Sequence, residues 1–201
     1  GLNNQGNYSV AIGNSAGLNN QGIYSVAVGA HAGGTGQGFN NVAIGRESGA
    51  NAQSLGCVAV GYESGRLNQG TFSTAIGTAS GEVSQGSFAV AIGNNAGTSG
   101  QGSYGVAIGA NCAYTSQGTS AVAVGRFAGG LNQSESAVAV GYGSGQNTQG
   151  INSVAVGLNS GNINQGVSAV AIGNNAGYGT QGDDTIAIGN NAGYGTQGDD
   201  A

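Results

Sequence analysis

Residues 5–13 read QGNYSVAIG, and the chain returns to this pattern at a step of sixteen residues. The pattern recurs as QGIYSVAVG at 21–29, QGSFAVAIG at 85–93 and QGTSAVAVG at 117–125. A strict period of this length is typical of repeat architectures, in which each unit packs against the next. We therefore expect residues 1–201 to form a single continuous array of sixteen-residue repeats, an excerpt of a longer fibre.

Residues that lie sixteen apart form a column, which we name by its member within residues 5–20. Column 11 holds only Ala, and column 13 holds only Gly. Column 10 holds Val or Ile except at Thr74, column 12 alternates between Ile and Val, and column 17 holds Gly except at Ala113. A chain with 44 Gly in 201 residues would often be disordered. The strict apolar columns indicate an ordered fold instead.

The repeat predicts two short strands and two turns in each unit. Helix is disfavoured, because each of its two or three Gly residues would cost about 1 kcal/mol. Residues 8–12 are rich in β-branched side chains and bounded by Gly, which is typical of a strand. A second extended piece is expected at 14–16, with turns near Gly13 and over 17–20. The predicted fold is all-β, a parallel β-solenoid (β-roll) of about twelve 16-residue coils stacked at ~4.8 Å.

Alternation along the first strand separates two faces. Val10 and Ile12 point one way, and Ser9 and Ala11 point the other. We assign the small side chains to the coil interior, which leaves Val and Ile as an external apolar stripe. Such a stripe is larger than a soluble monomer tolerates, so we expect chains to associate along it. The reverse assignment, with Val and Ile inside and Ala at a tight contact, stays open at this stage and also predicts association. The predicted oligomer interface comprises Val10, Ile12, Val26, Val28, Val42, Ile44, Val58, Val60, Val90 and Ile92.

Column 5 is an unbroken column of Gln. Identical amides stacked at the strand spacing can donate and accept along the column, as they do in cross-β ladders. We therefore interpret the column as a structural ladder that braces a Gly-rich corner. Its members are Gln5, Gln21, Gln37, Gln53, Gln69, Gln85, Gln101, Gln117, Gln133, Gln149, Gln165, Gln181 and Gln197.

Composition excludes several classes of partner. Lys and Arg total 3 against 8 Asp and Glu, so no basic patch is available for a nucleic acid. No apolar run approaches the ~18–20 residues that cross a bilayer, so we expect no membrane insertion in this segment. Cys57 and Cys112 lie in different columns, roughly 14 Å or more apart at the strand spacing. A disulfide needs about 7 Å between Cα atoms, so both thiols are expected to be unpaired.

Few residues could carry chemistry. The single His31 shares its column with Glu47 and Glu63, which we interpret as a variable outer turn rather than a site. Arg66 precedes Glu82 by one repeat, which predicts a surface ion pair. With one His, no Lys and no acid–base cluster, the chain is not expected to be an enzyme or to bind a cofactor.

The last two repeats contain four carboxylates in register. Stacking places Asp183 beside Asp199 and Asp184 beside Asp200. Two hypotheses remain for these carboxylates: they are solvated, or they bridge a cation such as Ca²⁺.

The sequence Ser-Val-Ala-Ile-Gly at 9–13, followed by Asn14, Ala16 and Gly17, resembles the head repeats of YadA-like trimeric autotransporter adhesins. Similar repeats occur in fibre proteins of phages and large viruses. The resemblance extends over essentially the whole chain. It implies a left-handed β-roll that assembles as a homotrimer on a cell or virion surface, where it is extracellular and mediates attachment. The unbroken Gln column and the strict period of sixteen depart from the pattern of that family.

Two functions fit these observations, and a third fits them less well. The first is an adhesive surface fibre whose variable outer columns attach to a host surface protein or glycan. The second is an architectural spacer or self-assembled extracellular filament, favoured by the duplicated final repeats at 173–184 and 189–200. Ice or crystal binding would need a regular outer column of Thr or Ser, whereas column 14 runs Asn, Ala, Arg, Tyr, Thr, Asn.

Overall fold

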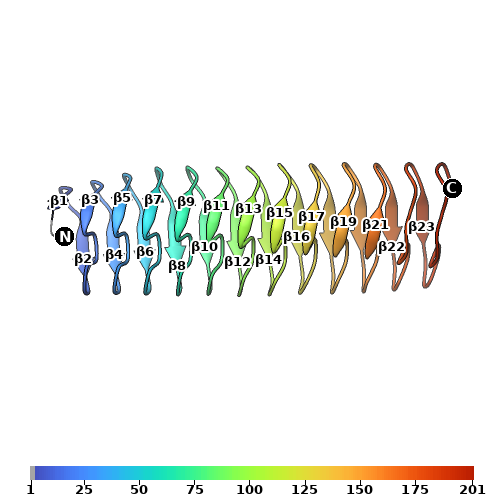
Figure 1. Ribbon diagram of the computed structural model, residues 1–201, viewed down its shortest axis with the longest axis horizontal. Coiled ribbons are helices and arrows are strands. Elements are labelled where there is room, and N and C mark those ends of the chain that lie inside the picture. Colours follow the sequence, from blue (N-terminus) through green and yellow to red (C-terminus); the bar gives the residue numbers. More distant parts are fainter. Residues whose placement is uncertain (1–2) are drawn as a thin grey trace. The chain divides into compact units, whose positions relative to one another are not determined.

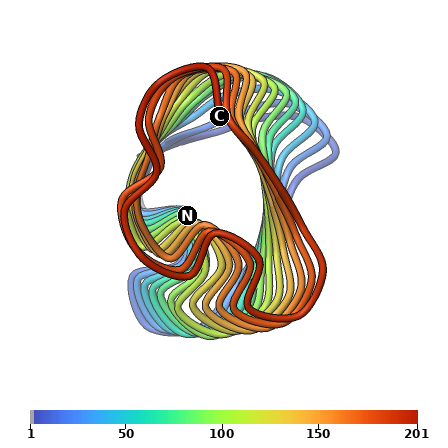
Figure 2. The same ribbon diagram turned by 90° about the vertical axis from the view of Figure 1, so that its right-hand side faces the viewer.

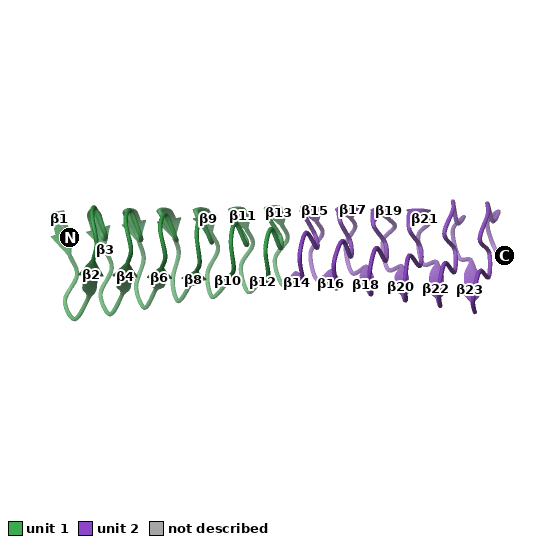
Figure 3. Ribbon diagram, turned by 90° about the horizontal axis from the view of Figure 1, so that it is seen from below, with its two compact units in different colours: residues 1–104 green, residues 105–201 purple. Residues whose placement is uncertain are grey.

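The computed structural model describes residues 3–201 and builds them from short parallel β-strands joined by turns. The chain divides into two compact units, Gly1–Tyr104 and Gly105–Ala201 (Figure 3). In each unit one sixteen-residue repeat makes one coil, and each coil as far as β21 contributes a strand to each of two sheets (Figure 1). The predicted all-β parallel solenoid of about twelve coils is confirmed.

The first unit contains thirteen strands. Those of one sheet are β1 (Asn3–Gln5), β3 (Asn19–Gln21), β5 (Thr35–Gln37), β7 (Asn51–Gln53), β9 (Leu67–Gln69), β11 (Val83–Gln85) and β13 (Ser99–Gln101). Those of the other sheet are β2 (Val10–Ile12), β4 (Val26–Val28), β6 (Val42–Ile44), β8 (Val58–Val60), β10 (Thr74–Ile76) and β12 (Val90–Ile92).

The second unit repeats this arrangement. Its odd-numbered strands up to β21 are β15 (Thr115–Gln117), β17 (Leu131–Gln133), β19 (Asn147–Gln149) and β21 (Ile163–Gln165). Its other sheet contains β14 (Val106–Ile108), β16 (Val122–Val124), β18 (Val138–Val140), β20 (Val154–Val156), β22 (Val170–Ile172) and β23 (Ile186–Ile188). Beyond β21 the Gln column continues as single parallel bridges from Gln165 to Gln181 and from Gln181 to Gln197.

Within each unit, every strand pairs with its own equivalent in the next coil. Ala11 pairs with Ala27, for example, and Gln5 with Gln21, so the register of both sheets is one repeat. In the end-on view the coils of each unit follow one another in this register, with a gradual twist (Figure 2). The columns of the sequence are therefore columns in space.

The second strand does not lie where the pattern predicts it. Residues 14–17 form a tight turn, with Ser15 at φ 54° and Gly17 at φ 53°, and the second strand is 19–21 rather than 14–16. Its middle residue, Asn20, has φ 55°, and the same column holds Gly36, Ala52 and Asn68 in the same conformation. Asn and Gly favour this left-handed region and are typical of turns. The sequence pattern therefore predicts a turn where the structure has a strand.

Small side chains fill the coil interior. The alanines of column 11 from Ala27 onward are almost completely buried, as are Ser25, Cys57 and the other members of column 9 from residue 25 to 185. The largest fully buried side chains are not apolar but amides, Gln69, Gln133, Gln149 and Gln181. The assignment of the small face to the interior is thus confirmed, and the reverse assignment is excluded.

Column 17 is Gly because the Gln side chain occupies the space beside it. A Cβ placed on Gly17 would lie 2.5 Å from Gln21 Oε1, and one on Gly129 would lie 2.7 Å from Gln133 Oε1. These glycines also have φ near 53°, where a Cβ is unfavourable. Ala113 is the exception in the column, since it is buried and adopts φ 43°.

We predict that Ala113→Gly stabilises the protein by about 1 kcal/mol, because it removes a left-handed non-Gly residue and a Cβ beside the Gln column. The measurement is the midpoint of urea unfolding. Ala128→Gly is the matched control, since Ala128 is buried in column 16 without a positive φ. That control should lower stability by a similar amount, and a fall with Ala113→Gly would contradict the argument.

Candidate functional site

The most extensive exposed feature in each unit is the apolar stripe formed by columns 10 and 12. Each strand that carries columns 10–12, such as β4, has a central Ala that faces the interior and two neighbouring residues that face outward. Ile12 is 61% exposed, and Ile44 and Ile172 remain 39% and 38% exposed within their units. The ten residues predicted to form an oligomer interface all belong to this stripe, five pairs on β2, β4, β6, β8 and β12. The structure places them on one face.

The Gln column connects the two sheets through the interior of the coil. Gln133 Nε2 donates to the carbonyl oxygen of Val122, 2.9 Å away on β16, while Gln133 itself ends β17. Gln21 and Gln69 make the same contact to the residue eleven positions earlier, at 2.8 Å and 2.9 Å. Each of these amides therefore crosses its coil.

The Gln side chains also bond to one another along the column. In the first unit Nε2 donates to the next Oε1 from Gln37 to Gln101, at distances between 2.7 and 3.1 Å. In the second unit the same bonds join Gln117 to Gln165 at 3.0 to 3.2 Å. Gln181 donates to Gln197 at 3.1 Å. Buried Oε1 atoms without a hydrogen-bond partner among residues 3–201 are those of Gln21, Gln37, Gln117 and Gln181.

Two of the four C-terminal aspartates accept backbone hydrogen bonds. Asp183 Oδ1 accepts from the Val167 amide at 2.8 Å, and Asp199 Oδ1 accepts from the Asp183 amide at 3.0 Å. Asp184 and Asp200 occupy the adjoining left-handed turn position, at φ 56° and 59°. Within the part of the chain that the structure describes, no group of three or more His, Cys, Asp or Glu side chains gathers around a common point. Calcium binding by these aspartates stays a prediction.

The other residues singled out by their chemistry lie apart from the stripe. Arg66 and Glu82 form the expected ion pair, with 2.6 Å between Nη2 and Oε1, and this bond raises the pKa of Arg66. His31, Gly34 and Glu47 are among the residues that line one shallow hollow. Both Cys57 and Cys112 are buried and unpaired, as predicted. Burial raises the pKa of both thiols, to about 12 for Cys112, so neither thiol is a nucleophile near neutral pH.

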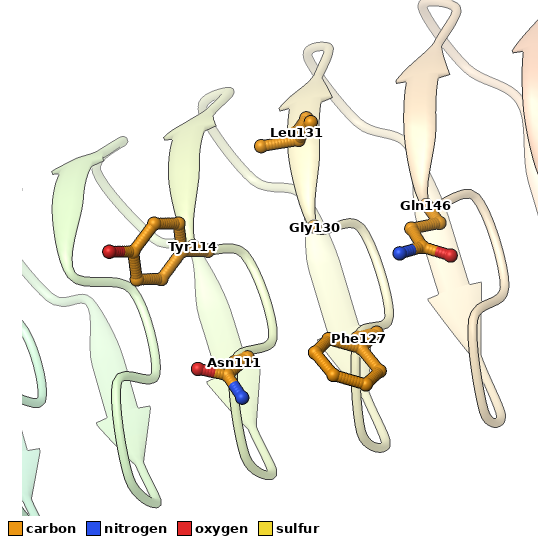
Figure 4. Close-up of a pocket in the computed structure, with 6 residues that line it drawn as sticks. All are labelled: Asn111, Tyr114, Phe127, Gly130, Leu131 and Gln146. Atoms are coloured by element: carbon orange, nitrogen blue, oxygen red, sulfur yellow. The ribbon is translucent and has the colours of Figure 1, made fainter.

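A second hollow, of about 300 Å³, was not predicted from the sequence (Figure 4). It lies in the second unit, and the residues that line it are Asn111, Tyr114, Phe127, Gly130, Leu131 and Gln146. Column 18 contains the signal that could have revealed it. Three successive coils carry Tyr114, Gly130 and Gln146 in this column, so a missing side chain stands between two long ones.

An arginine and a second aromatic ring pack against Phe127, one of the residues that line this hollow. The Arg126 guanidinium lies 4.6 Å from the centroid of the Phe127 ring and 5.9 Å from that of Tyr142. The two rings meet edge to face at 5.8 Å. Aromatic residues also stack in column 8 of the first unit, where the rings of Phe88 and Tyr104 are 5.1 Å apart.

Comparison with known proteins agrees with the fold. Residues 180–192 match the family model described as YadA head domain repeat (2 copies). The resemblance to YadA-like head repeats is confirmed by this match, which covers a short stretch of the chain. A search of curated proteins found no match. Among the described residues, no helix is long and apolar enough to cross a membrane.

We predict that Gln133→Leu destabilises the protein by about 3 kcal/mol. The substitution removes the bonds from Gln133 Nε2 to the Val122 carbonyl and to Gln149 Oε1, and the bond that Gln133 Oε1 accepts from Gln117 Nε2. Each buried hydrogen bond lost costs roughly 1 kcal/mol. Urea unfolding measures the change. Gln5→Leu is the control, because Gln5 is exposed and makes a single bond of 3.3 Å to the Ser9 carbonyl. An equal loss of stability in the two variants would contradict the prediction that the buried amide stabilises the fold more than the exposed one.

We also predict that a thiol reagent at pH 8 labels neither cysteine in the folded protein and labels both in urea. With a pKa of about 12, Cys112 would be about one part in ten thousand thiolate at pH 8. Mass spectrometry of the reacted protein counts the labels. Rapid labelling without denaturant would mean that the coil interior opens.

Proposed function

We propose that this chain is a segment of a homotrimeric, adhesive fibre displayed on the outer surface of a cell or a virion. The β-solenoid built from YadA-like head repeats supports this proposal, since such heads form trimers and are exposed at the surface. The fold and its family are structural and adhesive in character rather than enzymatic. Trimer formation, attachment and the extracellular location are the parts of the proposal that go beyond the fold.

The single observation that carries the proposal is the exposed Val and Ile stripe. Coil after coil in each unit presents two β-branched side chains on the same face, with no charged residue in column 10 or 12. Contiguous apolar patches larger than a few hundred Å² are rare on soluble monomers and mark interaction surfaces. Because the stripe repeats with the coil, a partner with the same repeat can cover it along its whole length. A further copy of this chain is such a partner.

Attachment would use the columns that vary. Column 14 contains Asn, Ala, Arg, Tyr, Thr and Leu at different coils, and column 18 varies as widely. Neither column is constrained by the interior, because the turns that carry them project outward. Several weak contacts on each of three chains would combine through avidity.

An architectural role is the second candidate. Residues 173–184 recur without change at 189–200, which lengthens an array without adding a new surface. A spacer of this kind would form the same trimer but would attach to nothing. Retention of protein-coated beads on a cell or glycan-coated surface distinguishes an adhesive fibre from a spacer.

We predict a native mass of about three times 19.2 kDa by light scattering. The double variant Ile76→Glu/Ile92→Glu should dissociate this assembly, because it places unpaired charges in the stripe on β10 and β12 and their burial would cost several kcal/mol. Expected masses are near 19.2 kDa for the variant at micromolar concentration.

Thr78→Glu/Asn94→Glu is the matched control. It adds the same charges two residues further along the same coils, at exposed positions of column 14. The control should retain the trimer. A monomeric wild-type chain, or equal dissociation of both double variants, would contradict the assignment of the stripe as the interface.

A further inference from the structure

We propose that the hollow around Gly130 binds one pyranose ring that bears a carboxylate, such as a uronic or sialic acid residue of an acidic glycan. The proposal rests on the attachment function above and names the ligand class and the site. Apolar, aromatic and amide groups line the hollow, and the Arg126 guanidinium lies 4.6 Å from the centroid of the ring of Phe127, one of the lining residues.

The hollow arises from one missing side chain. Tyr114 and Gln146 lie on the coils on either side of Gly130, and the absence of a side chain at Gly130 leaves a gap between them (Figure 4). A Cβ on Gly130 would lie 3.3 Å from the Gln146 carbonyl oxygen and 3.4 Å from that of Phe127. Gly130 does not have a positive φ, so its backbone does not require glycine. Gly130 therefore matters because its missing side chain leaves the hollow open.

The walls of the hollow match the two surfaces of a sugar. Tyr114, Phe127 and Leu131 supply apolar faces, which suit the C–H face of a pyranose, because an aromatic ring is electron-rich on its face. Asn111 and Gln146 supply amides, which can both donate to and accept from hydroxyl groups. A volume of about 300 Å³ is at the small end for ligand pockets, which favours a single monosaccharide unit.

Phe127 occupies its position at a conformational cost. It has φ 61°, in the left-handed region that a bulky side chain enters unfavourably. Column 15 places Asn at five other coils, at residues 95, 111, 159, 175 and 191, and Asn tolerates this conformation well. Phe88 and Tyr104 of column 8 adopt the same conformation, both at φ 59°, so the φ of Phe127 does not by itself mark a function. Here the aromatic ring both lines the hollow and supports the arginine.

Arg126 provides the charge for a carboxylate. Of the three arginines, Arg46 and Arg66 form ion pairs, whereas Arg126 forms none with any residue of 3–201 and lies on the Phe127 ring instead. Its side chain is exposed, and guanidinium groups bind carboxylates through two parallel hydrogen bonds. The carboxylates of the second unit are confined to columns 7 and 8, at the other turn of the coil. No neighbouring acid in its own turn competes for Arg126.

The first unit contains a natural comparison. Gly34 occupies the same column as Gly130 and also lies in a hollow, but that hollow is lined by Leu18, His31, Thr35, Glu47, Ala50 and Asn51. It has no aromatic wall, and a carboxylate of the protein faces it. Such a hollow would repel an acidic sugar, which makes Gly34 the matched control position.

The test titrates the whole chain, in its native assembly, with each probe and measures binding by ligand-observed NMR. The probes are methyl β-D-glucuronide and methyl β-D-glucoside, which differ only in the carboxylate. We expect the glucuronide to bind with a dissociation constant of about 1–10 mM and the glucoside to bind roughly fivefold more weakly. A parallel titration with the methyl α-glycoside of N-acetylneuraminic acid shows whether a uronic or a sialic acid supplies the carboxylate.

Four variants separate the parts of the site. Gly130→Thr fills the hollow and should abolish binding of all probes, and Thr98 shows that its column accepts threonine. Gly34→Thr should change nothing. Arg126→Gln should lower glucuronide affinity to that of the glucoside. Phe127→Asn should weaken binding of both glycosides at least threefold without lowering the melting temperature, because it relaxes the backbone.

The proposal is overturned if no probe binds below about 50 mM, or if Gly130→Thr binds like the wild type. Equal affinity for glucuronide and glucoside, or an unchanged affinity in Arg126→Gln, would also overturn it. These outcomes are independent of the fibre function. A trimer that attaches to surfaces but binds no probe contradicts only the site, whereas a chain that binds the probe without assembling or attaching contradicts the proposed function.

Discussion

The buried amide of the Gln column sets the dimensions of each coil. A primary amide removed from water must satisfy its donors and acceptor within the protein, because an unpaired polar group there costs roughly 1–3 kcal/mol. Gln133 meets this requirement by donating across the coil to Val122 and along the column to Gln149, while accepting from Gln117. The first bond holds the two sheets of a coil at a constant distance. The others recur from Gln37 to Gln101 and from Gln117 to Gln165, and an insertion within either run would break them.

The remaining columns follow from that distance. Between the two sheets there is room for the Gln side chain and for methyl-sized groups, and column 11 accordingly contains only Ala. Column 17 must leave space for the Gln side chain and is Gly at every coil but one. Larger apolar side chains cannot enter the interior, so Val and Ile of columns 10 and 12 face outward. The same constraint that closes the coil thus creates the surface that a partner chain could cover.

Variation is confined to turns that the interior does not restrict. Column 15 accepts His31, Glu47 and Phe127, although every non-Gly residue described in it has a positive φ. Column 18 accepts Tyr114, Gly130 and Gln146 on three consecutive coils. Because a coil contacts its neighbours at a fixed register, differences in side-chain size between neighbouring turns create local hollows and protrusions on the surface. A rigid repeat can therefore carry individual sites without any change to its interior.

The sequence by itself determined the period, the stacking of each column on itself and the parallel all-β class. The reason is that the same residues recur at a constant step, so each repeat needs the same surroundings, and stacked identical coils provide them. It also placed a strand at 8–12, of which the structure keeps Val10–Ile12 because Tyr8 lies in a turn at φ 58°. The unpaired state of Cys57 and Cys112 was likewise predicted. Only the tertiary structure decided that the second strand is 19–21, since Asn20 adopts a left-handed conformation within it and hides the pattern. It also decided that Val and Ile face outward, and that the space at Gly130 stays open as a hollow. These features depend on distances between coils, which a linear pattern does not contain.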